Sequence, residues 1–547
     1  MSRRILVFSL LLLLCLSGLA FAAEEPDYGG TYVVGIPSDW GEMFNDILYE
    51  SAYDGEVNMI VYNALVEYDE KMKVIPDLAK SWDISEDGNT ITFHLHKGVK
   101  FHDGHELTAE DVAYTYRTIL HPDYTGVRAG SFMVLKGAKD FKEGKTEELE
   151  GIKILDDYTI QFILSKNDAP FIGNLIYGIL PAHLLKDIPV AELENADFNR
   201  NPVGTGPFKF VEYKSQQYIK LEAFEDYFEG RPYLDQYVMK RVSTDTLPIH
   251  FEKNELDWAY NGVHKEHFKK LKDMDHLEGY TYLDMGYSYI GINQTSPKLK
   301  DKRVRQALTY GFRRQVIIDV LFKGYGQVAN GPIPPVSWAY TDEVNDYSFN
   351  QAKARNLLKE AGYIDRDGDG IRENEEGQKL ELDLYVSETA TKGKMICELF
   401  QQMMKLIDVK VNVILMEFNA LLEMTISSKD WDMYTMSWGL SPDPDSITIF
   451  HSDAAWNDVY FYNEENDRLL EEGKAEMNFE KRKEIYKEWQ KLINEELPYI
   501  FLLYPERTEI MSNRMRGYNR NPGAQGLFVG PNGYMYHKLW IPSELQD

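Results

Sequence analysis

The stretch that decides the fold is DGNTITFHLHKGVKFHDGHELTAEDV, residues 87–112. Ile91, Phe93 and Leu95 alternate with polar residues, which is typical of a half-buried strand. Together with the run from Trp82 to Ile84 and the turn residues between the two runs, this strand predicts a β-hairpin. Thr108-Ala-Glu-Asp111 then carries the capping signature of a helix N-terminus. The stretch therefore predicts a strand, a loop and a helix in close succession.

Other parts of the chain repeat this alternation of helix and strand signals. Strand patterns occupy Gly30 to Ile36, Leu380 to Val386, and Tyr499 to Tyr504. A second hairpin is predicted from the runs Ile152 to Ile154 and Tyr158 to Leu164, with a turn at Asp156-Asp157 between them. Apolar residues at helical spacing occupy Val304 to Leu321 and Ile485 to Ile493. Because the two kinds of signal are interleaved from end to end, with no long linker, we expect an α/β or α+β fold with several sheets.

The charge of the chain excludes two classes of partner. Its 547 residues carry a formal net charge of −29, and such a surface repels nucleic acid and anionic membranes. Aromatic residues are abundant for so polar a chain, with 36 Tyr, 26 Phe and 9 Trp. Because aromatic side chains line many ligand clefts, we expect a small-molecule partner and no nucleic acid.

The N-terminus is predicted to be a signal peptide, residues 1–22. Arg3 and Arg4 precede an apolar run, Ile5 to Leu16, which is too short to span a bilayer of about 30 Å as a helix. Ala20-Phe21-Ala22 fits the small-x-small rule for cleavage, so the mature chain would start at Ala23. The protein is therefore expected to be exported.

The two cysteines predict neither a disulfide nor a lipid anchor. Cys15 follows Leu14 inside the apolar run, whereas a lipid-attachment cysteine usually follows a small residue, so we favour soluble export over a lipoprotein. Cleavage would leave Cys397 alone, so no intramolecular disulfide is expected. Apolar neighbours at helical spacing predict that Cys397 is buried in a helix.

The motifs of the chain, taken in order, resemble those of the family 5 extracellular solute-binding proteins. Besides residues 87–112, the matching stretches are Pro202-Val-Gly-Thr-Gly-Pro-Phe208, Tyr289-Ile-Gly-Ile-Asn293, Val304-Arg-Gln-Ala307, Asn466-Asp-Arg-Leu-Leu470, Arg482 to Tyr486 and Leu497-Pro-Tyr499. Members of this family are the dipeptide-, oligopeptide- and nickel-binding proteins of ABC importers. Each motif alone is weak, but their common order over the whole mature chain makes the resemblance specific.

The resemblance implies a type II periplasmic-binding fold of the α/β class, in which two lobes are joined by a hinge of crossing strands. Lobe I would consist of residues 23–60, 183–285 and 513–547, with an additional α+β domain at 61–182, and lobe II of residues 286–512. The chain would cross between the lobes near residue 286 and return near residue 512.

The resemblance also implies a function. A small solute, a di- or oligopeptide, would bind between the lobes, which would close over it and deliver it to an ABC permease in the inner membrane. The chain would be a monomer with no catalytic role and no required cofactor, in the periplasm or on the outer face of a single-membrane cell. An oligosaccharide- or nickel-binding member of the family and a secreted hydrolase are the alternatives. The chain holds no Gly-x-Ser-x-Gly elbow, Walker loop or Rossmann fingerprint, which argues against an enzyme.

The segment expected to line the cleft is Ser437-Trp438-Gly439-Leu440-Ser441. In peptide-binding relatives the strand at this place offers backbone groups to the peptide, and an Asp three residues after the Trp takes the ligand's ammonium. This chain has Ser441 at that position. Asp443 is a candidate for a displaced counter-ion, since a buried ammonium needs a carboxylate partner. Two other interpretations stay open, namely a ligand without an ammonium and a surface turn shaped by neighbouring prolines.

A second candidate contact is the loop Ser38-Asp39-Trp40, which follows the first strand. In this fold that loop borders the ligand, and an aromatic ring there suits stacking on a peptide or a sugar. An ordinary exposed loop explains the same residues equally well.

The segment Asp365-Arg-Asp-Gly-Asp-Gly370 has the spacing of a calcium loop. Counted from Asp365, the further expected ligands are Asp367 at position 3, Asp369 at position 5, the carbonyl of Ile371 at position 7 and Glu376 at position 12. Arg372 occupies position 8, which is normally apolar, and a strand pattern rather than a helix follows. We therefore expect a structural calcium site rather than a sensor, with an acidic solvated turn as the alternative.

Four histidines, His94, His96, His102 and His105, raise the question of a nickel or zinc site. Phe101-His-Asp-Gly104 recurs in family members that bind unrelated ligands, so we interpret it as part of the fold. No transition-metal site is predicted from these residues.

Overall fold

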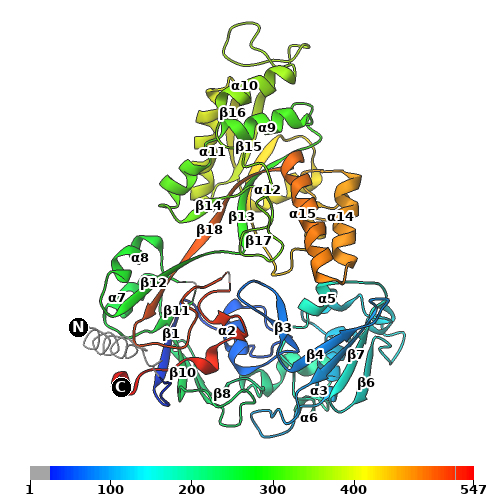
Figure 1. The fold of residues 1–547 in the computed structure, drawn as a ribbon, viewed down its shortest axis with the longest axis vertical. Coiled ribbons are helices and arrows are strands. Elements are labelled where there is room, and N and C mark those ends of the chain that lie inside the picture. The colour runs from blue at the N-terminus through cyan, green and yellow to red at the C-terminus, as the bar shows by residue number, and fades with distance from the viewer. Residues whose placement is uncertain (1–24, 261, 524, 547) are drawn as a thin grey trace, which may run out of the picture.

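The computed structural model describes residues 25–260, 262–523 and 525–546 (Figure 1). The predicted signal peptide and the predicted mature start at Ala23 lie outside the described residues. The described chain forms two halves, drawn one above the other in Figure 1, which are connected by one long strand and by the link between two consecutive strands. These strands are β12 (Leu277–Leu283), β13 (Gly286–Ile292) and β18 (Tyr499–Ser512). The mixture of sheets and helices in both halves confirms the α/β class.

The lower half is built on a five-stranded sheet of order β11-β1-β10-β9-β8. Its strands are β1 (Thr31–Ile36), β8 (Phe208–Lys214), β9 (Tyr218–Ala223), β10 (Gln236–Arg241) and β11 (Trp258–Ala259). β1 is parallel to both of its neighbours, whereas β8 and β9 form an antiparallel hairpin. Helix α2 (Ala52–Val61) begins at Ser51, whose hydroxyl accepts the N–H of Tyr53, and most of its residues are buried. This buried helix brings polar side chains to the boundary between the halves.

The predicted hairpins form a separate antiparallel sheet of order β4-β5-β7-β6. Its strands are β4 (Ala79–Ile84), β5 (Thr90–Leu95), β6 (Ile152–Asp156) and β7 (Thr159–Ile163). Both hairpins are confirmed, because Trp82 lies opposite Phe93 and Ile154 lies opposite Ile160. Helix α3 (Ala109–Leu120) has the predicted N-terminus, where the N–H of Thr108 donates to the Asp111 carboxylate over 2.9 Å.

The upper half is built on a sheet in which β18, β13, β17, β15 and β16 are neighbours, and β14 also pairs with β18. The new strands are β14 (Gly326–Val328), β15 (Glu381–Ser387), β16 (Lys410–Met416) and β17 (Met433–Gly439). Successive residues of β13 point to opposite faces, so Ile290 packs into an aliphatic core and Tyr289 into an aromatic one. The aliphatic core lies under α9 (Lys302–Gly311), α10 (Gln351–Glu360) and α11 (Thr391–Lys405), and the aromatic core lies under α14 (Glu464–Ala475) and α15 (Phe479–Glu496).

The hinge consists of one long strand and two consecutive ones. β18 pairs with β13 between Tyr499 and Leu503, and with β12 from Glu506 to Ser512. The change of partner in β18 lies between Leu503 and Glu506. The crossing near residue 286 and the return near residue 512 stay predictions. The bounds of the two lobes and of the additional domain at 61–182 stay a prediction.

The prediction of a single helix from Val304 to Leu321 is wrong. α9 ends at Gly311 because Phe312 adopts an extended conformation and packs on Phe400, with ring centroids 5.0 Å apart. The guanidinium of Arg314 then donates to the carbonyl oxygens of Phe501 over 2.9 Å and Asp346 over 2.6 Å. A π-helical turn, η4 (Ile317–Leu321), completes the segment. Periodicity did not predict the break because the interrupting residues are themselves apolar or hydrogen-bonded inside the core.

Two further properties of the helices bear on the predictions. α11 buries Cys397 completely, as predicted, and burial raises the pKa of its thiol to about 12. Among the described residues, no helix combines the length and the apolar character that crossing a membrane requires.

Candidate functional site

Three adjoining cavities lie where the two halves meet. We call them the lower, central and upper cavities, and their volumes are about 220, 440 and 200 Å³. The lower and central cavities share Met59, Pro442, Gln525, Tyr534 and Tyr536, and the central and upper cavities share Met285, Gly439 and Leu440. The shared walls place the three cavities in one row along the boundary between the halves.

The end of β17 forms the wall between the central and upper cavities. Trp438, Gly439, Leu440, Ser441 and Asp443 line the upper cavity. The backbone N–H of Leu440 donates to the carbonyl of Met285 over 3.0 Å, which ties this end of β17 to the hinge. The indole of Trp438 meets that of Trp456 edge to face, with centroids 6.1 Å apart. The structure therefore brings most of the predicted segment to a cavity between the halves.

Ser437 is held by the hinge strand instead of lining the cavity. Its hydroxyl lies 2.8 Å from that of Ser288 on β13, which is the residue opposite it in the sheet. Because the β-strand period sends neighbouring side chains to opposite faces, Ser437 and Trp438 cannot line one wall together.

Asp443 is part of an ion pair. Arg482 Nη1 lies 2.6 Å from Oδ2 of Asp443, and Nη2 lies 2.7 Å from Oδ1. Arg482 comes from α15 and lies over the ring of Trp338, and only 7% of its side chain is exposed. The carboxylate expected to receive a ligand's ammonium therefore already has a cationic partner, and the ligand role of Asp443 stays a prediction. Sequence reasoning missed the pairing because no local pattern connects residues 443 and 482.

The central cavity is acidic at its base. Burial raises the pKa of Glu56 on α2 to about 8, and the nearby Glu509 adds to the rise. Glu509 on β18 accepts the indole N–H of Trp258 over 3.1 Å and a hydrogen bond from the hydroxyl of Tyr282. At the rim, Arg507 Nε pairs with Asp284 Oδ2 over 3.0 Å across the two hinge segments.

The lower cavity is lined by four carboxylates, namely Asp46, Glu67, Asp77 and Glu229. Burial raises the pKa of Glu67 to about 9 and that of Asp77 to about 8. Glu67 accepts the backbone N–H of Tyr534 over 2.9 Å, and Asp77 accepts the backbone N–H of Ala64 over 2.8 Å. Sequence reasoning missed this group because its members lie far apart along the chain.

Comparison with known proteins places the chain in a family. The sequence model of the bacterial extracellular solute-binding proteins, family 5 Middle, matches residues 73–458. The oligopeptide-binding protein AppA of Bacillus subtilis is 36% identical over 513 residues, which cover 92% of this chain and 91% of AppA. This chain belongs to the family 5 solute-binding proteins.

Two more comparisons describe the range of the family. The heme-binding protein A of Haemophilus influenzae is 30% identical over 502 residues, covering 86% of each chain. The structure of Bacillus subtilis AppA in complex with a nonapeptide matches with a TM-score of 0.67 at 33% identity, covering 95% of this chain and 100% of AppA. The family 5 resemblance and the type II fold with two lobes are thus confirmed.

The loop Ser38-Asp39-Trp40 of this family 5 chain does not line any of the three cavities. The Trp40 side chain is 5% exposed and meets the ring of Tyr213 edge to face at 5.9 Å, so it is part of the lower core. Asp39 pairs with Arg241 on β10 over 2.6 Å. The structure does not bring these three residues to the Trp438 segment, and a ligand contact by them stays a prediction.

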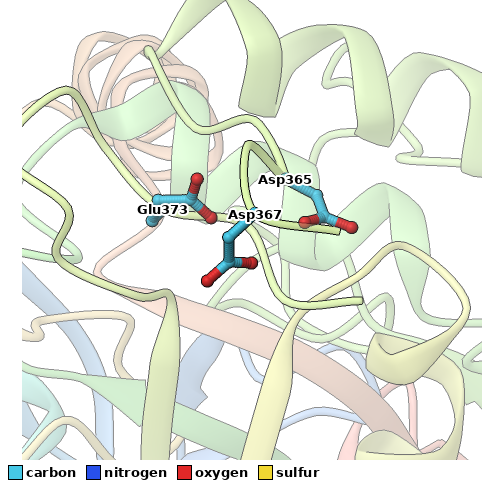
Figure 2. A group of neighbouring side chains, drawn as sticks. All are labelled: Asp365, Asp367 and Glu373. Carbon is cyan, nitrogen blue, oxygen red and sulfur yellow. The ribbon is translucent and has the colours of Figure 1, made fainter. Parts of the chain in front are cut away.

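The predicted calcium loop contains a cluster that differs from the expected set (Figure 2). Carboxylate oxygens of Asp365, Asp367 and Glu373 lie within 4.8 Å of one another. Asp369 and Glu376 do not belong to this cluster, because Asp369 pairs with Lys379 and Glu376 lies in the turn after Asn374. Bridges of Glu373 to Ile364 and to Lys379 place position 9 of the loop, rather than position 12, beside Asp365.

Glu373 is the member of the calcium-loop cluster that the sequence did not predict. It is 5% exposed, its Oε1 accepts the N–H of Arg366 over 2.7 Å, and its Oε2 has no hydrogen-bond partner among the described residues. The ammonium of Lys379 lies 3.1 Å from Asp367. The carbonyl of Ile371 stays a predicted ligand, and its N–H donates to Asp369 over 2.9 Å.

His102 and His105 make contacts within the fold. His102 lies with Nε2 2.9 Å from the carbonyl of Gly206 and Nδ1 3.3 Å from the N–H of Gly204. Burial lowers the pKa of His102 to about 4, so the ring is neutral at pH 7. His105 stacks on His183 at 3.9 Å.

Proposed function

We propose that this chain captures peptides between its two halves and delivers them to an ABC permease. The observation that carries the proposal is the position of Trp438 to Ser441, which lines the upper cavity at the end of a strand that pairs directly with the hinge. β15 pairs with β17 only at Met433 and Tyr434. An extended peptide can use such unpaired strand edges for backbone hydrogen bonds. AppA, which shares 36% identity with this chain, is named an oligopeptide-binding protein.

The mechanism follows from the hinge. A ligand that binds between two hinged halves is removed from water when they close. The closed state is stabilised by contacts that exist only when both halves touch the ligand. An affinity of ~1 µM corresponds to about 8 kcal/mol, which satisfied backbone hydrogen bonds and buried apolar area can supply. No bond of the ligand is broken in this mechanism.

The finer statements of the proposal concern context. We infer that the chain acts as a monomer without catalysis, that a signal peptide at 1–22 exports it, and that it works in the periplasm or on the outer face of a single-membrane cell. A permease of the inner membrane is the proposed partner. Native mass spectrometry of protein purified without refolding reports both the mass of the assembly and any bound solute.

A thermal-shift screen tests the ligand class. Di- to pentapeptides are expected to raise the melting temperature by mass action, whereas cello-oligomers and nickel are not. A rise with cello-oligomers or nickel alone would reject the peptide proposal in favour of the other family ligands. Peptide hydrolysis during incubation would instead reject the binding-protein proposal in favour of a secreted hydrolase.

We also propose that the loop from Asp365 to Glu373 binds calcium as a structural ion, apart from the ligand. Asp365, Asp367 and the half-satisfied Glu373 would supply hard oxygen ligands, which calcium prefers. Calcium would compete with Lys379, whose ammonium pairs with Asp367 and Asp369. Binding of peptide itself would need no cofactor.

A further inference from the structure

The lower cavity collects acidic side chains without a cationic partner in the described part of its wall. Asp46, Glu67, Asp77 and Glu229 all line it, and no lysine or arginine does so among the described residues. His537, the remaining titratable base in its wall, lies 3.6 Å from Glu229. Burial lowers the pKa of His537 to about 4, so this ring does not balance the carboxylates at pH 7.

Charged groups outside the cavity wall do not supply the missing cationic partner either. The charge of Lys538 lowers the pKa of Glu67 slightly, but burial and Asp77 raise it more. Arg128 acts on Asp46 in the same minor way, and its guanidinium lies over the rings of Tyr49 and Tyr177. Carboxyl groups kept out of water without a cation are costly, so their convergence on one cavity calls for an explanation.

Asn58 is an independent sign that the cavity is built for a polar guest. It comes from α2, is 1% exposed and lines the lower cavity. Neither its amide oxygen nor its amide nitrogen has a hydrogen-bond partner among the described residues. Buried amides are nearly always hydrogen-bonded, which means that this side chain has capacity reserved for another molecule.

The size and position of the cavity suit a side chain. Its volume of about 220 Å³ lies below the range of roughly 300–1,000 Å³ of pockets that hold whole small ligands. Pro442 and Met59 separate it from the central cavity and line both. A ligand that lies along the end of β17 can therefore send one side chain past Pro442 into the lower cavity.

We infer that the lower cavity binds the positively charged side chain of the ligand, a lysine or arginine of a bound peptide, with Glu67, Asp77 and Glu229 as counter-charges. This inference rests on the proposed peptide-binding function and specifies its substrate class. Asn58 would hydrogen-bond the same cation or the carbonyl beside it. Because a cation in the cavity favours the ionised carboxyl groups, its binding releases protons that Glu67 and Asp77 hold in the ligand-free protein.

Isothermal titration of the mature protein with Ala-Lys-Ala and Ala-norleucine-Ala tests the inference. The two peptides differ only in the ammonium group of the lysine side chain, since norleucine has an uncharged aliphatic side chain. Ala-Lys-Ala is expected to bind about tenfold or more tightly, which is the scale of a charged hydrogen bond. Titrations in buffers of different ionisation heat should show proton release with Ala-Lys-Ala and none with Ala-norleucine-Ala.

Variants separate a recognition role from a structural one. Glu67→Gln is expected to weaken the affinity for Ala-Lys-Ala about tenfold and to change the affinity for Ala-norleucine-Ala by less than about twofold. Glu229→Gln, whose side chain is 46% exposed, should act in the same direction and serves if the first variant does not fold. Glu192→Gln is the matched control, because Glu192 is exposed and is not one of the residues that line the cavity.

The outcomes distinguish this inference from the function on which it rests. Equal affinity of the wild-type protein for both peptides would overturn the cationic pocket and leave peptide binding intact. An equal loss of affinity for both peptides in Glu67→Gln would also overturn the cationic pocket, since the residue would then have a structural role. Binding of neither peptide, nor of any peptide in the thermal screen, would overturn the inference together with the proposed function.

Discussion

Arg482 holds both carboxylate oxygens of Asp443, at 2.6 and 2.7 Å. The pair connects α15 to the segment that follows β17, so it fixes the loop that forms one wall of the upper cavity. Arg482 also donates to the carbonyl of Gly473 over 2.7 Å, which joins the loop to α14. The geometry of the candidate site therefore depends on a contact outside the strand that forms it.

Breaking this pair should destabilise the protein. Asp443→Asn leaves the buried guanidinium of Arg482 without its charge partner, and we expect the free energy of unfolding to fall by about 3 kcal/mol. Urea unfolding monitored by circular dichroism measures the change. Asp453→Asn is the control, because Asp453 is exposed in the same region and should change stability by less than about 0.5 kcal/mol. Similar stabilities of the two variants would contradict the structural role of the pair.

Trp438 and Trp40 should respond differently to substitution, although both were predicted to contact the ligand. Trp438→Ala removes a ring that lines the upper cavity, and peptide affinity should fall about tenfold, the scale of one aromatic contact. Trp40→Phe alters a ring in the lower core, so it should lower the melting temperature and leave affinity within about twofold. Calorimetric titration and thermal unfolding of both variants measure these effects. A loss of affinity in Trp40→Phe would restore the Ser38-Asp39-Trp40 loop as a ligand contact.

Calcium should stabilise the protein through Glu373. Chelation is expected to lower the melting temperature, and added calcium to restore it. Glu373→Gln should abolish this response, whereas Glu376→Gln, three positions further on, should keep it because Glu376 lies outside the cluster. Lys379→Met removes the competing ammonium and should strengthen calcium binding. An unchanged melting curve with and without chelator, in both the wild type and Lys379→Met, would reject the site.

The lower cavity should make the ligand-free protein less stable as pH rises. The pKa of Glu67 is raised from its ordinary 4.5 to about 9, so the folded state holds a proton that the unfolded state loses between these values. Stability is therefore lost progressively from about pH 4.5 upward, and the loss is complete near pH 9. Glu67→Gln removes this loss. We expect the free energy of unfolding of the variant to exceed that of the wild type by on the order of 2 kcal/mol at pH 8, and the two free energies to be equal at pH 4.

Urea unfolding at the two pH values checks the expected crossover. Glu192→Gln should follow the wild-type curve at both. A Glu67→Gln variant that is less stable than the wild type at pH 8 would show that the carboxylate is ionised and paired in the folded protein, contrary to the expected direction.

Local patterns predicted much of the fold. Alternation predicted both hairpins of the β4–β7 sheet, and the Thr108 signature marked the start of α3. The one long helix that failed, Val304 to Leu321, was interrupted by Phe312 and Arg314, whose partners Phe400 and Phe501 lie far along the chain. A periodic pattern reports which face is buried, but it does not report which distant residue will pull a segment out of the helix.

The sequence by itself determined the family and the kind of fold, because these rest on short motifs and their order; the ligand role of the segment around Trp438 stays a prediction. Only the tertiary structure showed that Arg482 forms an ion pair with Asp443, and that Glu373 rather than Glu376 lies beside Asp365. It also showed that Asn58 lines the same cavity as Glu67, Asp77 and Glu229. The physical reason is that charge pairing and desolvation act over a few ångströms in space, whereas a local sequence pattern does not report which residues the folded chain brings within that distance.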